Sequence, residues 1–107
     1  MRHILEISSR AVAGREEDYE RWYANVHVGE VLALPGFVSV ERFSRSSLDG
    51  QPTGEFVALY TVETDDPAAL IQSLFAATPT MQLTDAIDGA SVRFEILTPR
   101  GNGVVTA

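Results

Sequence analysis

The residues best suited to chemistry lie close together in residues 21–37, RWYANVHVGEVLALPGF. This segment contains the only tryptophan of the chain, Trp22, beside Tyr23, and one of the two histidines, His27. A neutral histidine is an effective general base near neutral pH. Glu30 follows three positions later, where a helix would let it hydrogen-bond to the ring, fix its tautomer and raise its basicity. With two flat aromatic rings nearby, the segment predicts a proton-transfer site beside an apolar pocket.

The same residues also have a purely structural interpretation. One helix face is formed by residues spaced i, i+3, i+4 and i+7, namely Tyr19, Trp22, Tyr23 and Val26. The aromatic residues can therefore be core residues that pack a helix on a sheet. His27 can bind a backbone carbonyl near a helix end, and Glu30 can be a solvated carboxylate.

The elements around this segment follow from the apolar pattern. We expect its helix to begin at about Arg15, to fray or kink near Gly29 and to end before Pro35-Gly36. Four strands are predicted at residues 3–9, 37–44, 55–63 and 91–98. A second helix is predicted from Asp65-Asp66-Pro67 to about Ala77.

The resulting order, βαββαβ, predicts the ferredoxin-like α+β fold, a four-stranded antiparallel sheet with both helices on one face. Residues 1–100 are interpreted as one domain, and residues 101–107 as a flexible or partner-contacting tail. On the predicted strand 55–63, apolar residues occur on both sides, whereas a sheet with one face in water is more one-sided. We therefore expect a second copy of the chain to cover the other face, giving a homodimer. Phe37 and Tyr60 are the strand residues that we expect in the pocket.

Composition excludes several classes of function. The chain has 107 residues and a net charge of −7, with acidic residues spread along it, which disfavours binding to nucleic acid or to an anionic membrane surface. It has no cysteine, no apolar run typical of a signal peptide or membrane span, and no nucleotide-binding or serine-hydrolase motif. Two isolated histidines indicate no metal site. We expect a cytoplasmic protein without a bound cofactor.

A longer pattern resembles a known family. In the EthD-like branch of the dimeric α/β-barrel superfamily, a helix ends in a pattern like W-Y-x-x-H-x-P-E/D, and a Pro-Gly-Phe turn leads into the second strand. This pattern falls on Trp22, Tyr23, His27, Glu30, Pro35, Gly36 and Phe37. Val28-Gly29 replaces the usual apolar-Pro pair after the histidine. The resemblance implies a homodimer with face-to-face sheets, and a cavity between the sheet and the helices of each protomer.

Relatives in this family include cofactor-free monooxygenases, polyketide cyclases and small lyases or decarboxylases, so the resemblance implies architecture more narrowly than chemistry. We expect a cofactor-free enzyme acting on an aromatic or polyketide-like metabolite by proton transfer, as a lyase, isomerase, decarboxylase or cyclase. His27 would be the base, Glu30 would orient it, and Trp22, Tyr23, Phe37 and Tyr60 would hold the substrate. A cofactor-independent monooxygenase and a non-catalytic small-molecule binding protein are the alternatives.

Overall fold

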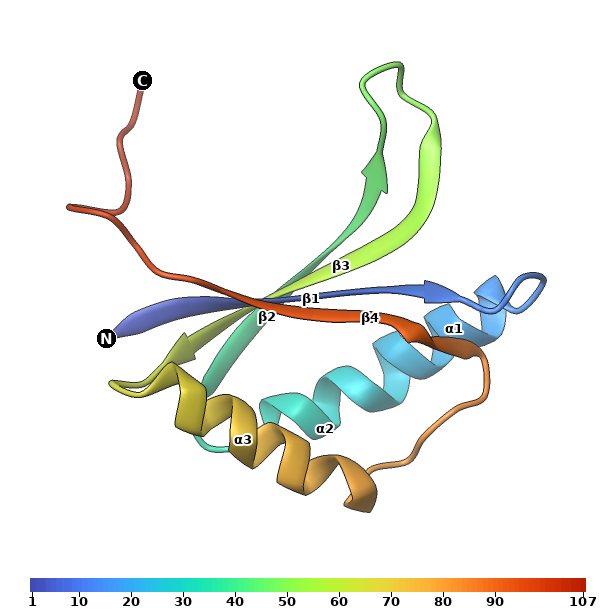
Figure 1. The fold of residues 1–107 in the computed structure, drawn as a ribbon, viewed down its shortest axis with the longest axis horizontal. Helices are drawn as coiled ribbons and strands as arrows, with labels where there is room; N and C mark the ends of the chain where they lie inside the picture. Colours follow the sequence, from blue (N-terminus) through green and yellow to red (C-terminus); the bar gives the residue numbers. More distant parts are fainter.

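The computed structural model describes residues 1–107 and has the expected order of elements (Figure 1). The strands are β1 (Arg2–Ala11), β2 (Phe37–Ser46), β3 (Pro52–Glu63) and β4 (Ile87–Leu97). The helices are α1 (Glu16–Trp22), α2 (Val28–Leu32) and α3 (Pro67–Ala77). A π-helical turn, η1 (Tyr23–His27), joins α1 to α2, and a 3₁₀ turn, η2 (Thr78–Thr80), extends α3. We call residues 16–32 the long helix.

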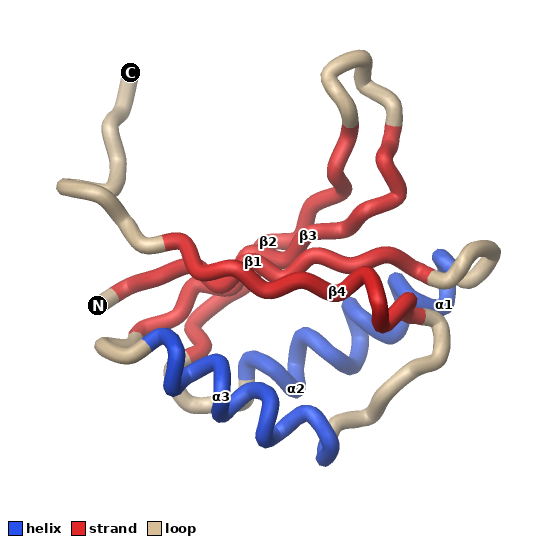
Figure 2. The backbone as a smooth tube through the Cα atoms, in the orientation of Figure 1, coloured by secondary structure: helices blue, strands red, loops and turns tan.

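The four strands form one sheet in the order β2-β3-β1-β4, and every neighbouring pair is antiparallel. The long helix and α3 both lie on one side of this sheet (Figure 2). The α+β class, the antiparallel sheet and the placement of the helices are therefore confirmed, consistent with a ferredoxin-like fold. The division into a domain and a tail stays a prediction, although residues 98–107 follow the last strand without regular structure and are all exposed.

The expected kink near Gly29 is wrong, because Gly29 lies inside α2. The irregular part of the long helix comes earlier, at η1, where the Val28 N–H donates to the carbonyl of Tyr23, five residues back instead of four. The helix does end before Pro35-Gly36, as expected. Gly36 has a φ of 90°, and a Cβ there would lie 2.7 Å from Leu70 Cδ1, so this turn requires glycine.

The start of α3 also follows from its sequence. The Asp66 side chain accepts a hydrogen bond from the Ala69 N–H at 3.0 Å, and Pro67 occupies the first helical position, where no N–H is needed. This cap fixes the direction in which α3 leaves β3. In this direction α3 places Leu74 in the core. Thr78, which follows α3, lies at the cavity described in the next section.

The core fills the space between the helices and the sheet. It consists of Leu5, Ile7, Tyr19, Trp22, Tyr23, Val31, Phe37, Ala58, Tyr60, Val62, Leu74 and Ala86. The central strands supply alternate residues to it, as the two-residue period of a strand requires. Trp22 and Tyr23 are thus core residues, in agreement with the structural interpretation of the sequence.

The opposite face of the sheet has no helix over it and is partly apolar. Its apolar residues are Ile4, Phe43, Val57, Leu59 and Leu97. Charged residues lie among them, and Arg45 pairs with Glu55 at 2.5 Å. The β2–β3 hairpin and the C-terminal segment both project on this side, away from the helices (Figure 1). None of the helices is long and apolar enough to cross a membrane.

Candidate functional site

A cavity of about 230 Å³ lies between the helices and the sheet. Its wall is mostly apolar, which is typical of small-molecule sites. The lining residues are Ile7 and Ser9 of β1, Trp22, Tyr23 and His27 of the long helix, Leu74 and Thr78, the loop residues Leu83 and Thr84, and Ile87, Val92 and Phe94 of β4. Three of the six predicted site residues therefore line one cavity: Trp22, Tyr23 and His27.

The π-helical turn brings these three side chains together. In a regular α-helix, residues five apart point roughly 140° away from each other around the axis. Across η1 the wider turn aligns them, and the ring of His27 stacks on Trp22 with centroids 4.5 Å apart and planes 19° apart. The edge of the same imidazole meets Tyr23 at 5.1 Å and 77°. This chain has three residues between Tyr23 and His27, whereas the family pattern W-Y-x-x-H has two. The wider π-helical turn accommodates the additional residue.

The imidazole of His27 makes no hydrogen bond within the chain. Its Nδ1 is buried and has no partner, and Nε2 also has no partner but is not fully enclosed. Burial lowers the pKa of His27 below its ordinary value of 6.5, and the nearby charge of Glu30 opposes this shift only in part. The ring is therefore neutral at neutral pH and has a lone pair available to accept a proton.

Glu30 lies close enough to His27 to act on its charge, but the expected hydrogen bond between them is not formed. Glu30 Oε2 accepts instead from the Gln82 N–H at 2.8 Å, and Oε1 is buried without a partner. Trp22 Nε1 donates to the Gln82 carbonyl at 2.7 Å. The long helix thus holds both backbone groups of Gln82, and with them the loop that supplies Leu83 and Thr84 to the cavity.

Tyr60 and Phe37 lie in the core and not in the cavity wall. The Tyr60 hydroxyl lies 3.4 Å from that of Tyr23, and Phe37 meets the Tyr60 ring edge-on at 5.9 Å. Burial raises the pKa of both tyrosines, so their hydroxyls stay protonated. Tyr60 can therefore influence a ligand only through the hydroxyl of Tyr23, and Phe37 only through Tyr60.

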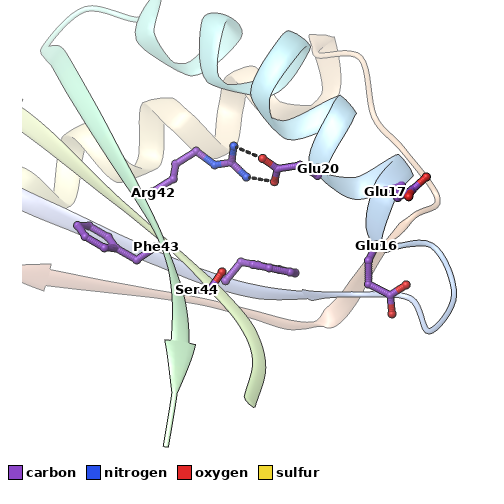
Figure 3. A pocket seen from close by; sticks show the side chains of 7 residues that line it. Glu16, Glu17, Glu20, Arg42, Phe43 and Ser44 are labelled. Carbon is purple, nitrogen blue, oxygen red and sulfur yellow. Dashed lines mark hydrogen bonds and ion pairs between the residues drawn. The ribbon is translucent and has the colours of Figure 1, made fainter. Parts of the chain in front are cut away.

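A second hollow, of about 390 Å³, lies between α1 and β2 (Figure 3). Arg42 dominates it, and its guanidinium bonds both carboxylate oxygens of Glu20, at 3.0 and 2.5 Å. The guanidinium carbon of Arg42 also lies 4.6 Å from the centre of the Tyr23 ring, a cation–π contact. The carboxylate of Glu20 compensates the charge of Arg42 at the surface, so we assign this arginine to support Tyr23 and not to bind a ligand.

Sequence reasoning missed two polar residues that belong to the cavity region, Ser9 and Tyr19. Their hydroxyl oxygens lie 2.6 Å apart in the interior, and Ser9 lines the cavity. The signal was available for Ser9, because alternation along the first strand places it on the same side as Leu5 and Ile7. Tyr19 was recognised only as part of an apolar face.

The loop residues Leu83 and Thr84 were missed for a different reason, since nothing local in the sequence places residues 81–86 over the long helix. Nowhere does the fold bring three or more histidine, cysteine or acidic side chains together as metal ligands would be.

With the geometry known, the chain was compared with known proteins. No family model matches it, and no curated protein sequence matches it. Among solved structures, it is similar to the crystal structure of an ethyl tert-butyl ether d (EthD) family protein from Bacillus halodurans c-125, with a TM-score of 0.56 and 13% identity. The match covers 92% of this chain and 99% of that chain. The chain has the fold of that EthD-family protein. The resemblance inferred from residues 22–37 is confirmed at the level of the fold.

Proposed function

We propose that the protein is a small cofactor-free enzyme in which His27 removes a proton from a compact aromatic or polyketide-like metabolite. The observation on which this rests is a neutral imidazole without any hydrogen-bond partner in the wall of an apolar cavity. An unpaired buried polar atom costs about 1–3 kcal/mol, so a fold retains one where it has a use. Proton acceptance is the use for which a neutral histidine is best suited.

The cavity limits the size of the substrate. Its volume of about 230 Å³ is smaller than the roughly 300–1,000 Å³ usual for drug-sized ligands. A substrate of one or two rings fits this space, while an extended polycyclic molecule would have to displace the loop that carries Leu83. The T-shaped pair of Tyr23 and His27 offers aromatic surface next to the base, which favours a flat substrate.

Glu30 stabilises the positive charge that His27 acquires in the reaction. When His27 accepts a proton it becomes an imidazolium, and the carboxylate of Glu30 favours that form electrostatically without a direct hydrogen bond. After removal of a C–H proton, the carbanion or enolate left on the substrate expels a leaving group, shifts a double bond or closes a ring. After removal of a carboxyl O–H proton, the carboxylate loses carbon dioxide, and the carbanion formed takes the proton back from His27. These outcomes correspond to the lyase, isomerase, decarboxylase and cyclase chemistries expected from the sequence.

We further propose that the protein acts as a cytoplasmic homodimer joined through the uncovered face of the sheet. Phe43 is 47% exposed and Leu97 is 44% exposed on that face. The β2–β3 hairpin and the C-terminal segment project on either side of this face and would contact a second copy of the chain bound there (Figure 1). A dimer mass by light scattering at micromolar concentration is expected, and it should revert to a monomer mass on Phe43→Glu.

The second candidate function is a non-catalytic binding protein. It is favoured by the missing bond between His27 and Glu30, since a base whose orientation is not fixed gives less help in catalysis. A binding protein would be stabilised by its ligand without forming product.

The test is turnover of a panel of one- and two-ring aromatic and polyketide metabolites, followed by mass spectrometry, with and without air. His27→Ala should lower kcat by about 10²–10⁴, the range typical of a general base. His3→Ala is the matched control, because His3 is also buried but bonds Thr98 far from the cavity wall. A product that requires air would indicate the cofactor-independent monooxygenase. Retained ligand without product would indicate the binding protein, and His27→Ala with full kcat would sink the proposed mechanism.

A further inference from the structure

Ser9 and Tyr19 form a buried pair of hydroxyl groups beneath the long helix. Ser9 is 2% exposed and Tyr19 is 1% exposed, and their oxygens lie 2.6 Å apart. Neither hydroxyl has another hydrogen-bond partner in the chain. Ser9 lines the cavity, whereas Tyr19 lies behind it, stacked on Phe56 at 5.1 Å.

Counting protons shows that this pair has one donor left over. Each hydroxyl has one proton to donate, and the bond between them uses only one. If Ser9 donated to Tyr19, the proton of Tyr19 would be buried in the core without an acceptor, which is costly. If Tyr19 donates to Ser9, the proton of Ser9 is free to point into the cavity, where a ligand can accept it. Burial raises the pKa of Tyr19, so its proton is present at neutral pH.

The other hydroxyls of the cavity wall are already engaged or lie farther out. Thr78 donates to the Leu74 carbonyl at 2.9 Å, and the hydroxyl of Tyr23 is paired with Tyr60. Thr84 accepts from the Ala86 N–H at 3.1 Å and belongs to the loop at the edge. By the same count the Tyr23–Tyr60 pair also has a proton left over, but its oxygens lie 3.4 Å apart. The bond between Ser9 and Tyr19 is 2.6 Å long and orients the hydroxyl of Ser9, so we assign Ser9 as the donor to a ligand.

We propose that Ser9 is a substrate-binding residue that donates a hydrogen bond to a carbonyl or phenol oxygen, and that Tyr19 positions it. The substrate class is then a one- or two-ring compound with an oxygen on or next to the ring. The proposal rests on the proposed function, because it assigns the substrate to the same cavity that His27 lines.

The assignment also completes the proton-transfer step. His27 takes a proton from the carbon next to the carbonyl, and the electron pair of that C–H bond forms the enolate C=C bond as the carbonyl π pair moves onto oxygen. Ser9 donates its hydrogen bond to that oxyanion, and the donation from Tyr19 strengthens it. In a substrate with a C=C bond next to that carbon, the anion is a dienolate. Return of the proton from His27 to its far carbon re-forms the carbonyl and completes a double-bond isomerisation that needs no other reactant.

The experiment uses two ligands of nearly the same shape, 1-indanone and indane, which differ by the ketone oxygen. Dissociation constants are measured by NMR titration of the indole N–H signal of Trp22, which is the only tryptophan and lines the cavity. The wild type should bind the ketone about threefold to tenfold more tightly, the range of one neutral hydrogen bond. Ser9→Ala should bind both ligands equally, and Tyr19→Phe, which keeps the ring in place, should reduce the preference.

Equal affinities in the wild type, a ketone preference that survives Ser9→Ala, or no binding of either ligand would each overturn the proposal. Because Ser9→Ala alters a buried site, its NMR spectrum checks the fold, and Tyr19→Phe provides the independent variant. His3→Ala, at a buried residue outside the cavity wall, should leave the ratio of the two affinities unchanged. The measurement is of binding alone, so a protein without turnover loses the proposed function but can still show this preference.

Discussion

The long helix carries two groups of polar side chains into the interior, and they differ in how completely they are hydrogen-bonded. Toward its start, Tyr19 pairs with Ser9 and Tyr23 pairs with Tyr60; we call these four residues the hydroxyl cluster. Toward its end, His27 Nδ1 and Glu30 Oε1 are both buried without a partner. Every hydroxyl of the first group has a hydrogen-bond partner within the fold, whereas neither buried atom of the second group has one.

This difference separates residues that hold the fold from residues kept for another purpose. Native proteins hydrogen-bond most of their buried polar groups, and exceptions concentrate where a ligand or a reaction supplies what is missing. A π-helical turn, a feature often found at functional sites, lies between the two groups. We therefore expect substitutions of the core tyrosine Tyr60 to affect stability most, and substitutions at His27 to affect function most.

The largest effect is expected for Tyr60→Ala. Tyr60 is 0% exposed, and its loss would leave a cavity in the core and an unpaired hydroxyl on Tyr23. The free energy of unfolding should fall by about 3–5 kcal/mol. Urea titration monitored by the fluorescence of Trp22 measures this free energy.

Leu48→Ala provides the control, at a fully exposed position in the β2–β3 loop, and it should change the free energy of unfolding by less than about 0.5 kcal/mol. A loss below about 1 kcal/mol for Tyr60→Ala would contradict the structural role of the cluster.

A smaller, local effect is expected for Glu30→Ala. The carboxylate accepts from the Gln82 N–H and helps to hold the loop at the edge of the cavity. Without it, hydrogen exchange at the Gln82 amide should accelerate by about tenfold, the equivalent of one hydrogen bond.

Glu17→Ala provides the control for this variant, because Glu17 is an exposed acid on the same helix whose side chain makes no hydrogen bond. Exchange at Gln82 should be unchanged in it. If exchange is equally slow in Glu30→Ala, Glu30 does not fasten the loop, and its role as the partner of His27 becomes the better explanation.

The smallest change in stability is expected for His27→Leu. Replacing a buried group that has no hydrogen bond with an apolar one of similar size removes an unpaired atom, so stability should change by less than about 1 kcal/mol or increase. His3→Leu is the contrast, since His3 Nδ1 bonds Thr98 Oγ1 at 3.0 Å and its loss should cost about 1 kcal/mol. Thermal unfolding of both variants at pH 7.5 tests the difference. A large loss for His27→Leu would show that His27 holds the fold.

The sequence predicted the fold well, because the fold depends on patterns that are local. Alternating apolar residues predicted the strands, and Asp66-Pro67 and Pro35-Gly36 set the limits of the helices. The π-helical turn was not predictable in this way, since no glycine or proline marks it and the apolar spacing from Tyr19 to Val26 fits an ordinary α-helix. What accompanies the turn is tertiary packing, since the rings of Trp22, Tyr23 and His27 contact one another and line one cavity.

The candidate site was predicted in its residue types more than in its contacts. Trp22, Tyr23 and His27 line the cavity as expected, but the partner of Glu30 is a backbone amide 52 positions away. Ser9 and Tyr19 meet because a strand residue and a helix residue cross in space, at a point that spacing along the chain does not reveal. Contacts of this kind depend on the whole fold, and a single sequence gives little information about them.

The pH dependence of stability provides the most sensitive test of the state of His27. Because its pKa is lowered in the folded protein, the unfolded chain binds more protons between that lowered pKa and the ordinary value of about 6.5. Stability therefore rises with pH in this window, and the folded protein loses stability as the pH falls from about 6.5 through the folded pKa. His27→Leu lacks this loss, so its melting temperature relative to wild type should rise between pH 7.5 and pH 5.5. Contributions from all other groups are largely shared and cancel in the difference.

Glu30→Gln should make the stability of the protein depend more steeply on pH, since it removes the charge that opposes the lowering of the His27 pKa. If the difference in melting temperature between His27→Leu and wild type stays constant with pH, His27 titrates alike in the folded and unfolded chain. The contrast between the hydroxyl cluster and His27 would then lose its support.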